Sequence, residues 1–218
     1  MSTNTTILPE LHFHKAAVNL RKVVHHTPLQ LHANLSRKYQ CNVYLKREDL
    51  QVVRSYKLRG AYNLMSSLSE DQLANGVVCA SAGNHAQGFA YSCKKLGVKG
   101  VVFMPVITPK QKIRQTSMFG EDAIQIQLAG DTFDDCASAA LQYTKENNMT
   151  FVPPFDHLKI IEGQGTVGLE ILEDTSDIDF LFLPVGGGGL SAGVGAYFKI
   201  GRDTSELQSR QYLVCRLL

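Results

Sequence analysis

The chain has 218 residues, enough for one large or two small domains, and a hydrophobic content of 44% supports a substantial core. The formal net charge is +2, and its lysines and arginines are scattered, so neither a nucleic acid nor an anionic membrane is an expected partner. No run of about 18 apolar residues predicts a membrane span, and the first residues lack the apolar core of a signal peptide.

The cysteines and histidines give no sign of a disulfide framework or a metal site. The five cysteines form no CxxC pair, and three of them lie inside apolar segments. We therefore expect reduced core cysteines in a cytoplasmic protein. The seven histidines lack metal-ligand spacing, so no metal is predicted.

The first third of the chain predicts short helices around one strand. The predicted elements are, in order, a helix over 11–24, a helix over 33–39, a strand over 43–46 and a helix from Ser55 to Leu68. Pro28 ends the first helical region because proline cannot continue a helix and restrains the residue before it. Ser55 is the expected N-cap of the last helix, which places Lys57 in its first turn.

Lys57 is an unusual residue for that position. A helix N-terminus carries roughly half a positive charge, and Arg54 and Arg59 are close in sequence. We expect these charges to lower the pKa of Lys57 and to make its amine a nucleophile or a base. The alternative is an ordinary surface lysine, which is what a single lysine usually is.

From Val77 onward, strands and helices alternate. The expected strands cover 77–80, 100–104, 123–128 and 149–152, and the expected helices cover 86–96, 109–118 and 131–147. Such alternation predicts a parallel sheet built through right-handed crossovers. A helix over 160–172 follows, with three internal glycines that indicate close packing or close approach of a ligand. A buried strand over 180–185 and a helix over 192–198 complete the pattern.

Four consecutive glycines, Gly186 to Gly189, lie between the last strand and the last helix. Their backbone N–H groups, with a helix N-terminus behind them, are suited to a phosphate group. A flexible turn is the plain alternative. Gly187-x-Gly189-x-x-Ala192 also fits a dinucleotide fingerprint, but that motif needs an acidic residue after the next strand, and Asp203 and Glu206 come too early.

A second turn of small residues runs from Ser81 to Gly88 at the start of another helix. Its backbone donors suit a carboxylate, and the amide of Asn84 can bond a ligand oxygen; a purely structural turn is the alternative. Together, a reactive amine, a phosphate cradle and a carboxylate cradle indicate pyridoxal 5′-phosphate (PLP) and an amino-acid substrate.

The motifs that carry a family resemblance are Lys46-Arg47-Glu48-Asp49-Leu50, Ser55-Tyr56-Lys57-Leu58-Arg59-Gly60-Ala61, Ser81-Ala82-Gly83-Asn84-His85-Ala86-Gln87-Gly88 and Gly186-Gly187-Gly188-Gly189-Leu190. In this order and spacing the chain, over about residues 10–199, resembles the fold-type II PLP enzymes, and among them bacterial biosynthetic L-threonine dehydratase. The resemblance implies an α/β fold of two lobes with parallel sheets flanked by helices. It places a small lobe at 70–152 and a large, incomplete lobe at 1–69 and 153–218, with the cofactor between them.

The resemblance also implies residue roles. Lys57 would bind PLP covalently as a Schiff base and, once released, would remove the α-proton of the substrate. Asn84 would bond the pyridine 3′-oxygen. The phosphate would be bound by Gly186, Gly187, Gly188, Gly189 and Leu190. The substrate carboxylate would be bound by Ser81, Gly83, Asn84 and His85.

The implied reaction is the dehydration and deamination of L-threonine to 2-oxobutanoate and ammonia, in isoleucine biosynthesis, by a cytoplasmic homo-oligomer. Similar serine racemases carry a serine at the position of Ala82, and alanine cannot donate a proton. We therefore expect elimination without efficient racemisation, and L-serine as a poorer substrate, since one methyl group is worth only about 1–3 kcal/mol.

After Lys199 the resemblance ends, and the tail over 200–218 differs from the expected continuation. We therefore expect a truncated or frame-shifted chain that lacks part of the large lobe. Three alternatives to the threonine lyase stay open: a PLP enzyme similar to serine dehydratases or racemases, a dinucleotide-binding oxidoreductase in which Lys57 is incidental, and an inactive truncated fragment.

Overall fold

The computed structural model describes residues 10–201 of the chain. The helices are α1 (Phe13–Leu20), α2 (Ala33–Tyr39), α3 (Lys57–Met65), α4 (Glu70–Asn75), α5 (Asn84–Leu96), α6 (Lys110–Gly120), α7 (Phe133–Glu146), α8 (Leu158–Asp174) and α9 (Gly189–Gly201), with short 3-10 turns η1 (Glu48–Leu50) and η2 (Glu121–Ala123). The strands are β1 (Leu29–Leu31), β2 (Tyr44–Lys46), β3 (Val77–Ala80), β4 (Gly100–Met104), β5 (Ile124–Leu128) and β6 (Thr150–Phe151).

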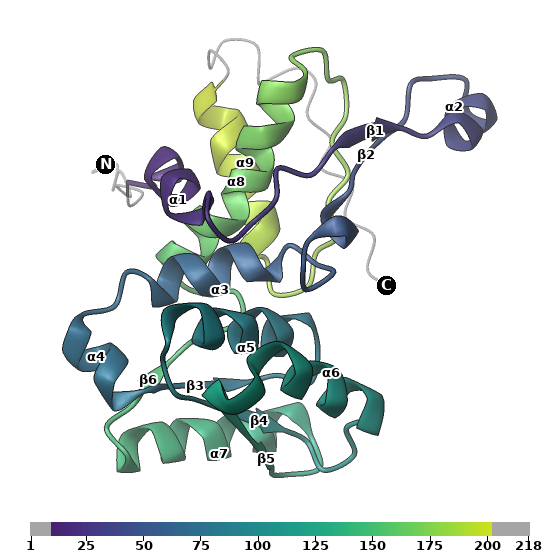
Figure 1. The fold of residues 1–218 in the computed structure, drawn as a ribbon. Coiled ribbons are helices and arrows are strands. Elements are labelled where there is room, and N and C mark those ends of the chain that lie inside the picture. Colours follow the sequence, from purple (N-terminus) through teal and green to yellow (C-terminus); the bar gives the residue numbers. More distant parts are fainter. Residues whose placement is uncertain (1–9, 202–218) are drawn as a thin grey trace, which may run out of the picture.

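The predicted parallel sheet is present, with strand order β5-β4-β3-β6. All three strand pairs are parallel, and Val77 of β3 lies opposite Gly100 on one side and Thr150 on the other. Helices α5 and α6 cover one face of the sheet and α7 covers the other (Figure 1). Alternate residues of β3 therefore enter different cores: Val77 packs with α5, and Val78 packs with α7.

Helix α8 is the centre of the other half of the molecule, where it lies against α1, α3 and α9 (Figure 1). Its glycines allow this close packing. A Cβ atom on Gly163 would come within 2.6 Å of the carbonyl oxygen of Arg59, and one on Gly168 within 3.2 Å of Val194. The expectation that the glycines of this helix mark close packing is confirmed.

Strands β1 and β2 pair as an antiparallel ribbon that extends from the body of the molecule and carries α2 at its tip (Figure 1). None of the residues of α2 is buried, and the helix is held locally, because the side chain of His32 accepts a hydrogen bond from the Leu35 N–H. The ribbon ends at η1, close to the start of α3.

The expected strand over 180–185 is not formed in the described part of the chain. The side chains of Phe180 and Phe182 are 59% and 67% exposed, whereas the apolar run predicted a fully buried strand. A strand requires a neighbour that takes up its backbone hydrogen bonds, and no strand of residues 10–201 pairs with this segment.

Smaller differences concern the ends of helices. Helix α1 ends at Leu20 rather than residue 24, α3 ends at Met65 rather than residue 68, and α9 begins at Gly189. Within the described residues, no helix has the length and apolar character needed to cross a membrane, and no group of three or more metal-binding side chains is present. Most of the divergent tail, residues 202–218, lies outside the described part, as do Asp203 and Glu206.

Candidate active site

Lys57 is the first residue of α3, and its amine points at a backbone carbonyl far along the chain. The Nζ atom donates a hydrogen bond to the carbonyl oxygen of Pro154 at 2.7 Å. Tyr56 occupies the N-cap position with helical backbone angles and makes no capping bond. The prediction that Ser55 caps the helix is therefore wrong: its hydroxyl is buried and has no hydrogen-bond partner among the described residues.

The pKa of Lys57 is lowered, as expected, but for a different reason. Burial of the amine lowers the pKa. The neighbouring arginines contribute little, because Arg54 is exposed and the charge of Arg59 is paired with two buried carboxylates, those of Glu48 and Glu170. A buried lysine with a lowered pKa supplies a neutral amine more readily than a surface lysine does.

The turn from Ser81 to Gly88 lies against the start of α3. A Cβ atom on Gly88 would come within 2.9 Å of the Leu58 nitrogen and 3.0 Å of the Lys57 carbonyl carbon. The turn is closed by a hydrogen bond from the Gly83 N–H to the Ser81 hydroxyl. Asn84 is exposed and begins α5, and no atom lies within 4 Å of where a Cβ on Gly83 would be, so this helix N-terminus is open.

His85 follows in the first turn of α5 and is buried. Its Nε2 atom lies 3.0 Å from the carbonyl oxygen of Val152, to which it donates. Burial lowers the pKa of His85 to about 4, the hydrogen bond to Val152 opposes that shift, and the charge of Lys57 adds to it. The imidazole is therefore neutral near pH 7 and anchors the turn rather than presenting a positive charge.

The glycine loop is closed on one side and open on the other. A Cβ atom on Gly187 would collide with the ring of Phe155, and one on Gly189 would come within 2.8 Å of the Phe155 carbonyl oxygen. Gly186 and Gly188 have no atom within 4 Å of a Cβ position, and Gly188 has φ of +84°, a backbone conformation that favours glycine. Leu190 is buried in the core beneath the loop. The open face and its unobstructed N–H groups fit a phosphate.

One short segment, residues 152–155, touches Lys57 and both small-residue turns predicted from sequence. Val152 holds His85, Pro154 accepts from Lys57, and Phe155 supports the glycine loop. Residues that are about 100 positions apart in the sequence are brought together by this segment, which leads from β6 to α8. The site residues predicted from sequence therefore lie around one place in the fold.

Sequence reasoning did not identify Val152, Pro154 and Phe155 as site residues. The signal that could have found them is their position, because they follow the last strand of the parallel sheet, and the carboxyl ends of such strands are where ligands bind. Ser55 was assigned a structural role, and its unpartnered hydroxyl two residues before Lys57 became visible only in the structure.

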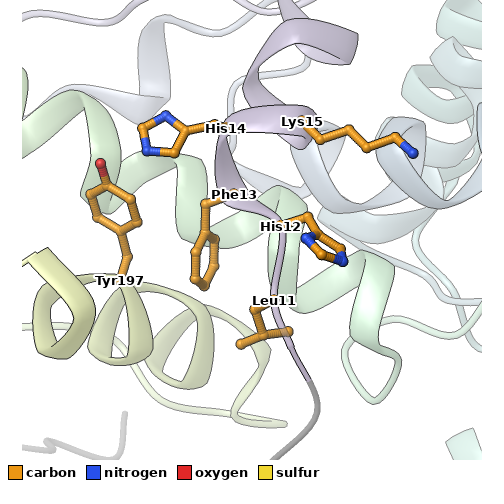
Figure 2. A pocket seen from close by; sticks show the side chains of 6 residues that line it. All are labelled: Leu11, His12, Phe13, His14, Lys15 and Tyr197. Atoms are coloured by element: carbon orange, nitrogen blue, oxygen red, sulfur yellow. The ribbon is translucent and has the colours of Figure 1, made fainter.

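A separate shallow pocket of about 230 Å³ lies between the start of α1 and α9. It is lined by Leu11, His12, Phe13, His14, Lys15 and Tyr197 (Figure 2). The rings of Phe13 and Tyr197 meet edge-to-face at 5.3 Å, and His14 lies beside Tyr197. None of the predicted site residues lines this pocket, so it is distinct from the site around Lys57.

Comparison with known proteins identifies the family. The family model described as "Pyridoxal-phosphate dependent enzyme" matches residues 20–214. The chain belongs to the pyridoxal-phosphate dependent enzyme family. Among curated members, the L-threonine dehydratase biosynthetic IlvA of Halalkalibacterium halodurans is 57% identical over 181 residues, which are 83% of this chain and 44% of the relative. The Bacillus subtilis protein of the same name is 56% identical over 195 residues, 88% of this chain and 46% of the relative.

Solved structures of family members have the same fold. The processed form of threonine deaminase isoform 2 from Solanum lycopersicum superposes with a TM-score of 0.83 at 39% identity, over 95% of this chain and 58% of that one. Serine racemase from Dictyostelium discoideum gives a TM-score of 0.82 at 31% identity, over 94% of this chain and 64% of that one. The fold-type II assignment is thus confirmed, and the chain spans about half the length of the curated relatives it matches.

Proposed function

We propose that this chain is a PLP-dependent lyase that dehydrates and deaminates L-threonine to 2-oxobutanoate and ammonia, with L-serine as a minor substrate. The observation that carries the proposal is the convergence of Lys57, the Ser81–Gly88 turn and the glycine loop on residues 152–155. The likeness to proteins named L-threonine dehydratase and threonine deaminase supports the choice of substrate.

The residues present fit the cofactor. Gly186, Gly187, Gly188, Gly189 and Leu190 would hold its phosphate, because the open face of the loop has room for the group and N–H donors without side chains in front of them. Asn84 would bond the pyridine 3′-oxygen, and Lys57 would hold the cofactor through its amine. When bound, PLP supplies the electron sink that stabilises negative charge at the α-carbon of an amino acid.

The chain's own residues supply proton transfer and orientation. Lys57 Nζ, whose pKa is lowered by burial, would take the proton from the α-carbon of the substrate. The backbone at the start of α5, with Ser81, Gly83, Asn84 and His85, would bind the substrate carboxylate at a helix N-terminus. Ala82 has no proton to donate, so this side of the substrate lacks an acid, which favours elimination over racemisation.

Further parts of the proposal concern context. We assign the smaller lobe to residues 70–152 and the larger lobe to 1–69 and 153–218, supported by the self-contained sheet of β3 to β6. A role in isoleucine biosynthesis follows the names of the relatives. We also propose a cytoplasmic location, which the free cysteines Cys41, Cys79, Cys93 and Cys136 support, and assembly as a homo-oligomer.

The test is the visible absorption spectrum after addition of PLP, followed by borohydride reduction and peptide mapping. We expect a Schiff-base band and a reduced adduct on Lys57, then turnover of threonine in excess of serine. Lys57→Ala should lose the adduct, and Lys99→Ala, which removes a distant lysine bonded to the Asp122 carbonyl, should retain it. A label spread over many lysines, or retention of a dinucleotide instead of PLP, would overturn the proposal; an adduct on Lys57 without turnover would favour an inactive fragment.

A further inference from the structure

Arg59, two residues after Lys57, has no role in the proposed chemistry, yet it is the most completely enclosed charge near the site. Its side chain is 0% exposed. Nε and Nη2 donate to the two carboxylate oxygens of Glu48 at 2.8 and 2.7 Å, and Nη1 and Nη2 donate to those of Glu170 at 2.6 and 2.9 Å. We call Glu48, Arg59 and Glu170 the Arg59 clamp.

The clamp joins three elements that are distant in sequence. Glu48 lies in η1 at the end of the β1–β2 ribbon, Arg59 in α3 and Glu170 in α8. Both carboxylates are supported in turn: the hydroxyl of Thr27 donates to Glu48 at 2.6 Å, and Lys46 pairs with Glu170 at 2.8 Å. Two bidentate pairs on one planar guanidinium fix its direction as well as its position.

Burying such a network is not an efficient way to stabilise a fold. The desolvation of two carboxylates and a guanidinium offsets much of their mutual attraction, and apolar replacements of similar volume are often as stable. The best-attested use of buried ionic groups is to specify one arrangement among several similar ones. Such a network is useful where the surrounding packing alone leaves an arrangement poorly specified.

The packing at the start of α3 has this property. On one side the backbone of Lys57 and Leu58 lies against Gly88 of α5, and on the other side the backbone of Arg59 and Gly60 lies against Gly163 of α8. Packed helices normally keep their rotation through ridges of side chains that fit into grooves. Where it meets these two glycines the turn presents no such ridge, so its rotation depends on its own side chains, which are the buried Leu58 and Arg59.

We propose that Arg59 is a positioning residue: by anchoring the first turn of α3 to Glu48 and Glu170, it fixes the rotation of the helix and thereby directs the amine of Lys57 at the Pro154 carbonyl. Residues two apart on an α-helix point about 200° apart around its axis. Lys57 and Arg59 therefore project to nearly opposite sides, toward residue 154 and toward the clamp. Any rotation of α3 about its axis that moves the Lys57 side chain must therefore also move the Arg59 side chain.

This inference rests on the proposed role of Lys57, but its test measures the titration of the Lys57 amine and not the turnover of substrate. The experiment uses the full chain without PLP, so that the Lys57 amine is free. It measures reductive methylation of each lysine by formaldehyde and cyanoborohydride across a pH series, with peptide mass spectrometry giving the titration midpoint of Lys57. The groups that face this amine are His85 from α5 and the ring of Tyr56. Neither is altered by the variants below.

Arg59→Lys keeps the positive charge but removes the guanidinium group that bonds to two carboxylates at once. Glu48→Gln is a milder change, because it removes the charge of Glu48 and keeps the shape of its side chain. Glu162→Gln is the matched control: Glu162 is also a buried acid of α8, bonded to Lys159 and to the His12 N–H, but it makes no contact with the clamp. Unfolding midpoints are measured for all variants.

In Arg59→Lys we expect the amine of Lys57 to gain contact with water and its midpoint to rise, leaving about tenfold less neutral amine at neutral pH for each unit of rise. Glu48→Gln should give a smaller rise, and Glu162→Gln should give none despite a loss of stability. If Arg59→Lys does not fold, Glu48→Gln decides alone. The inference would be overturned if the Lys57 midpoint in both clamp variants equalled that of the unsubstituted protein. It would also be overturned if Glu162→Gln raised the Lys57 midpoint as much as the clamp variants do. An ordinary midpoint already in the unmodified protein would instead count against the proposed role of Lys57.

Discussion

Replacing Gly88 by alanine tests the contact between α5 and the backbone of Lys57. The new Cβ atom would lie 2.9 Å from the Leu58 nitrogen and 3.0 Å from the Lys57 carbonyl carbon. Non-bonded heavy atoms prefer about 3.5–4.0 Å, so the start of α3 must move away by roughly 0.5–1 Å. Both atoms belong to the backbone, and no side chain can turn aside to relieve the contact.

Two terms of opposite sign set the size of the effect on stability. Overpacking of this kind costs about 1–3 kcal/mol, and alanine is better than glycine inside a helix by about 1 kcal/mol. The free energy of unfolding should therefore fall by up to about 2 kcal/mol. The effect on reactivity should be larger, because a displacement of about 1 Å at a reacting group can lower a rate roughly 100-fold.

The assay compares Gly88→Ala with Gly195→Ala. Gly195 lies in α9, and no atom is within 4 Å of its Cβ position, so alanine there should raise stability by about 0.5–1 kcal/mol and leave Lys57 unaffected. Urea denaturation gives the stability, and borohydride trapping of PLP on Lys57 gives the rate of attachment. If Gly88→Ala stabilises the protein as Gly195→Ala does and attaches PLP at the original rate, the close approach of α5 to Lys57 is refuted.

Three further predictions concern charge, pH and the glycine loop. Arg59→Met leaves Glu48 and Glu170 buried without their cation and should lower the free energy of unfolding by about 3–5 kcal/mol; urea denaturation measures this, and a loss below about 1 kcal/mol would contradict it. The pKa of His85 is 6.5 in the unfolded chain and about 4 in the folded protein, where the side chain is buried. As the pH drops from 6.5 to 4, the unfolded state therefore binds a proton before the folded state does. The free energy of unfolding should fall by up to about 3 kcal/mol over this pH range. Denaturation at several pH values tests this, and a His85→Gln variant with an unchanged slope would speak against it. Phe155→Ala removes the ring beneath Gly187 and should weaken PLP binding about tenfold, since truncation costs most for well-packed aromatic residues; spectroscopic titration with PLP measures it, and unchanged affinity would show that the ring does not support the loop.

The alternating part of the chain could be predicted well from the sequence, because its signals are local. Strands β3 and β4 are short apolar runs between turns, and the helices between them follow the expected spacing. The two small-residue turns and the helix start at Lys57 could also be found, since glycines and helix-start signals identify them without knowledge of distant contacts. That these features lie together in the fold was predicted only because an amine, a phosphate site and a carboxylate site are all needed to bind PLP and an amino acid.

The features that could not be predicted depend on contacts between distant residues. Ser55 has the side chain of a good N-cap, but the helix begins with Tyr56 in helical conformation, and the serine hydroxyl is buried instead. The apolar segment over 180–185 reads as a strand, but pairing depends on a neighbour that local sequence cannot supply. The pKa of Lys57 is lowered by burial, and sequence spacing does not predict burial by residues as distant as Pro154, which accepts its hydrogen bond.

The hydrogen bond from Lys57 to Pro154 spans 97 residues of sequence, and this separation has a consequence for synthesis. At about 5–20 residues per second, a ribosome needs roughly 5–20 s to make the chain between the two. The sheet strands β3 to β5 and helices α5 to α7 are translated in that interval, and they contact mostly their sequence neighbours, so they can fold first. Throughout this interval the Pro154 carbonyl that accepts from Lys57 has not been made, and α8 is not yet packed against α3. The nascent chain therefore lacks the hydrogen bond from Lys57 to Pro154 and the contact of α3 with α8, and both can form only when residues 152–170 have left the ribosome.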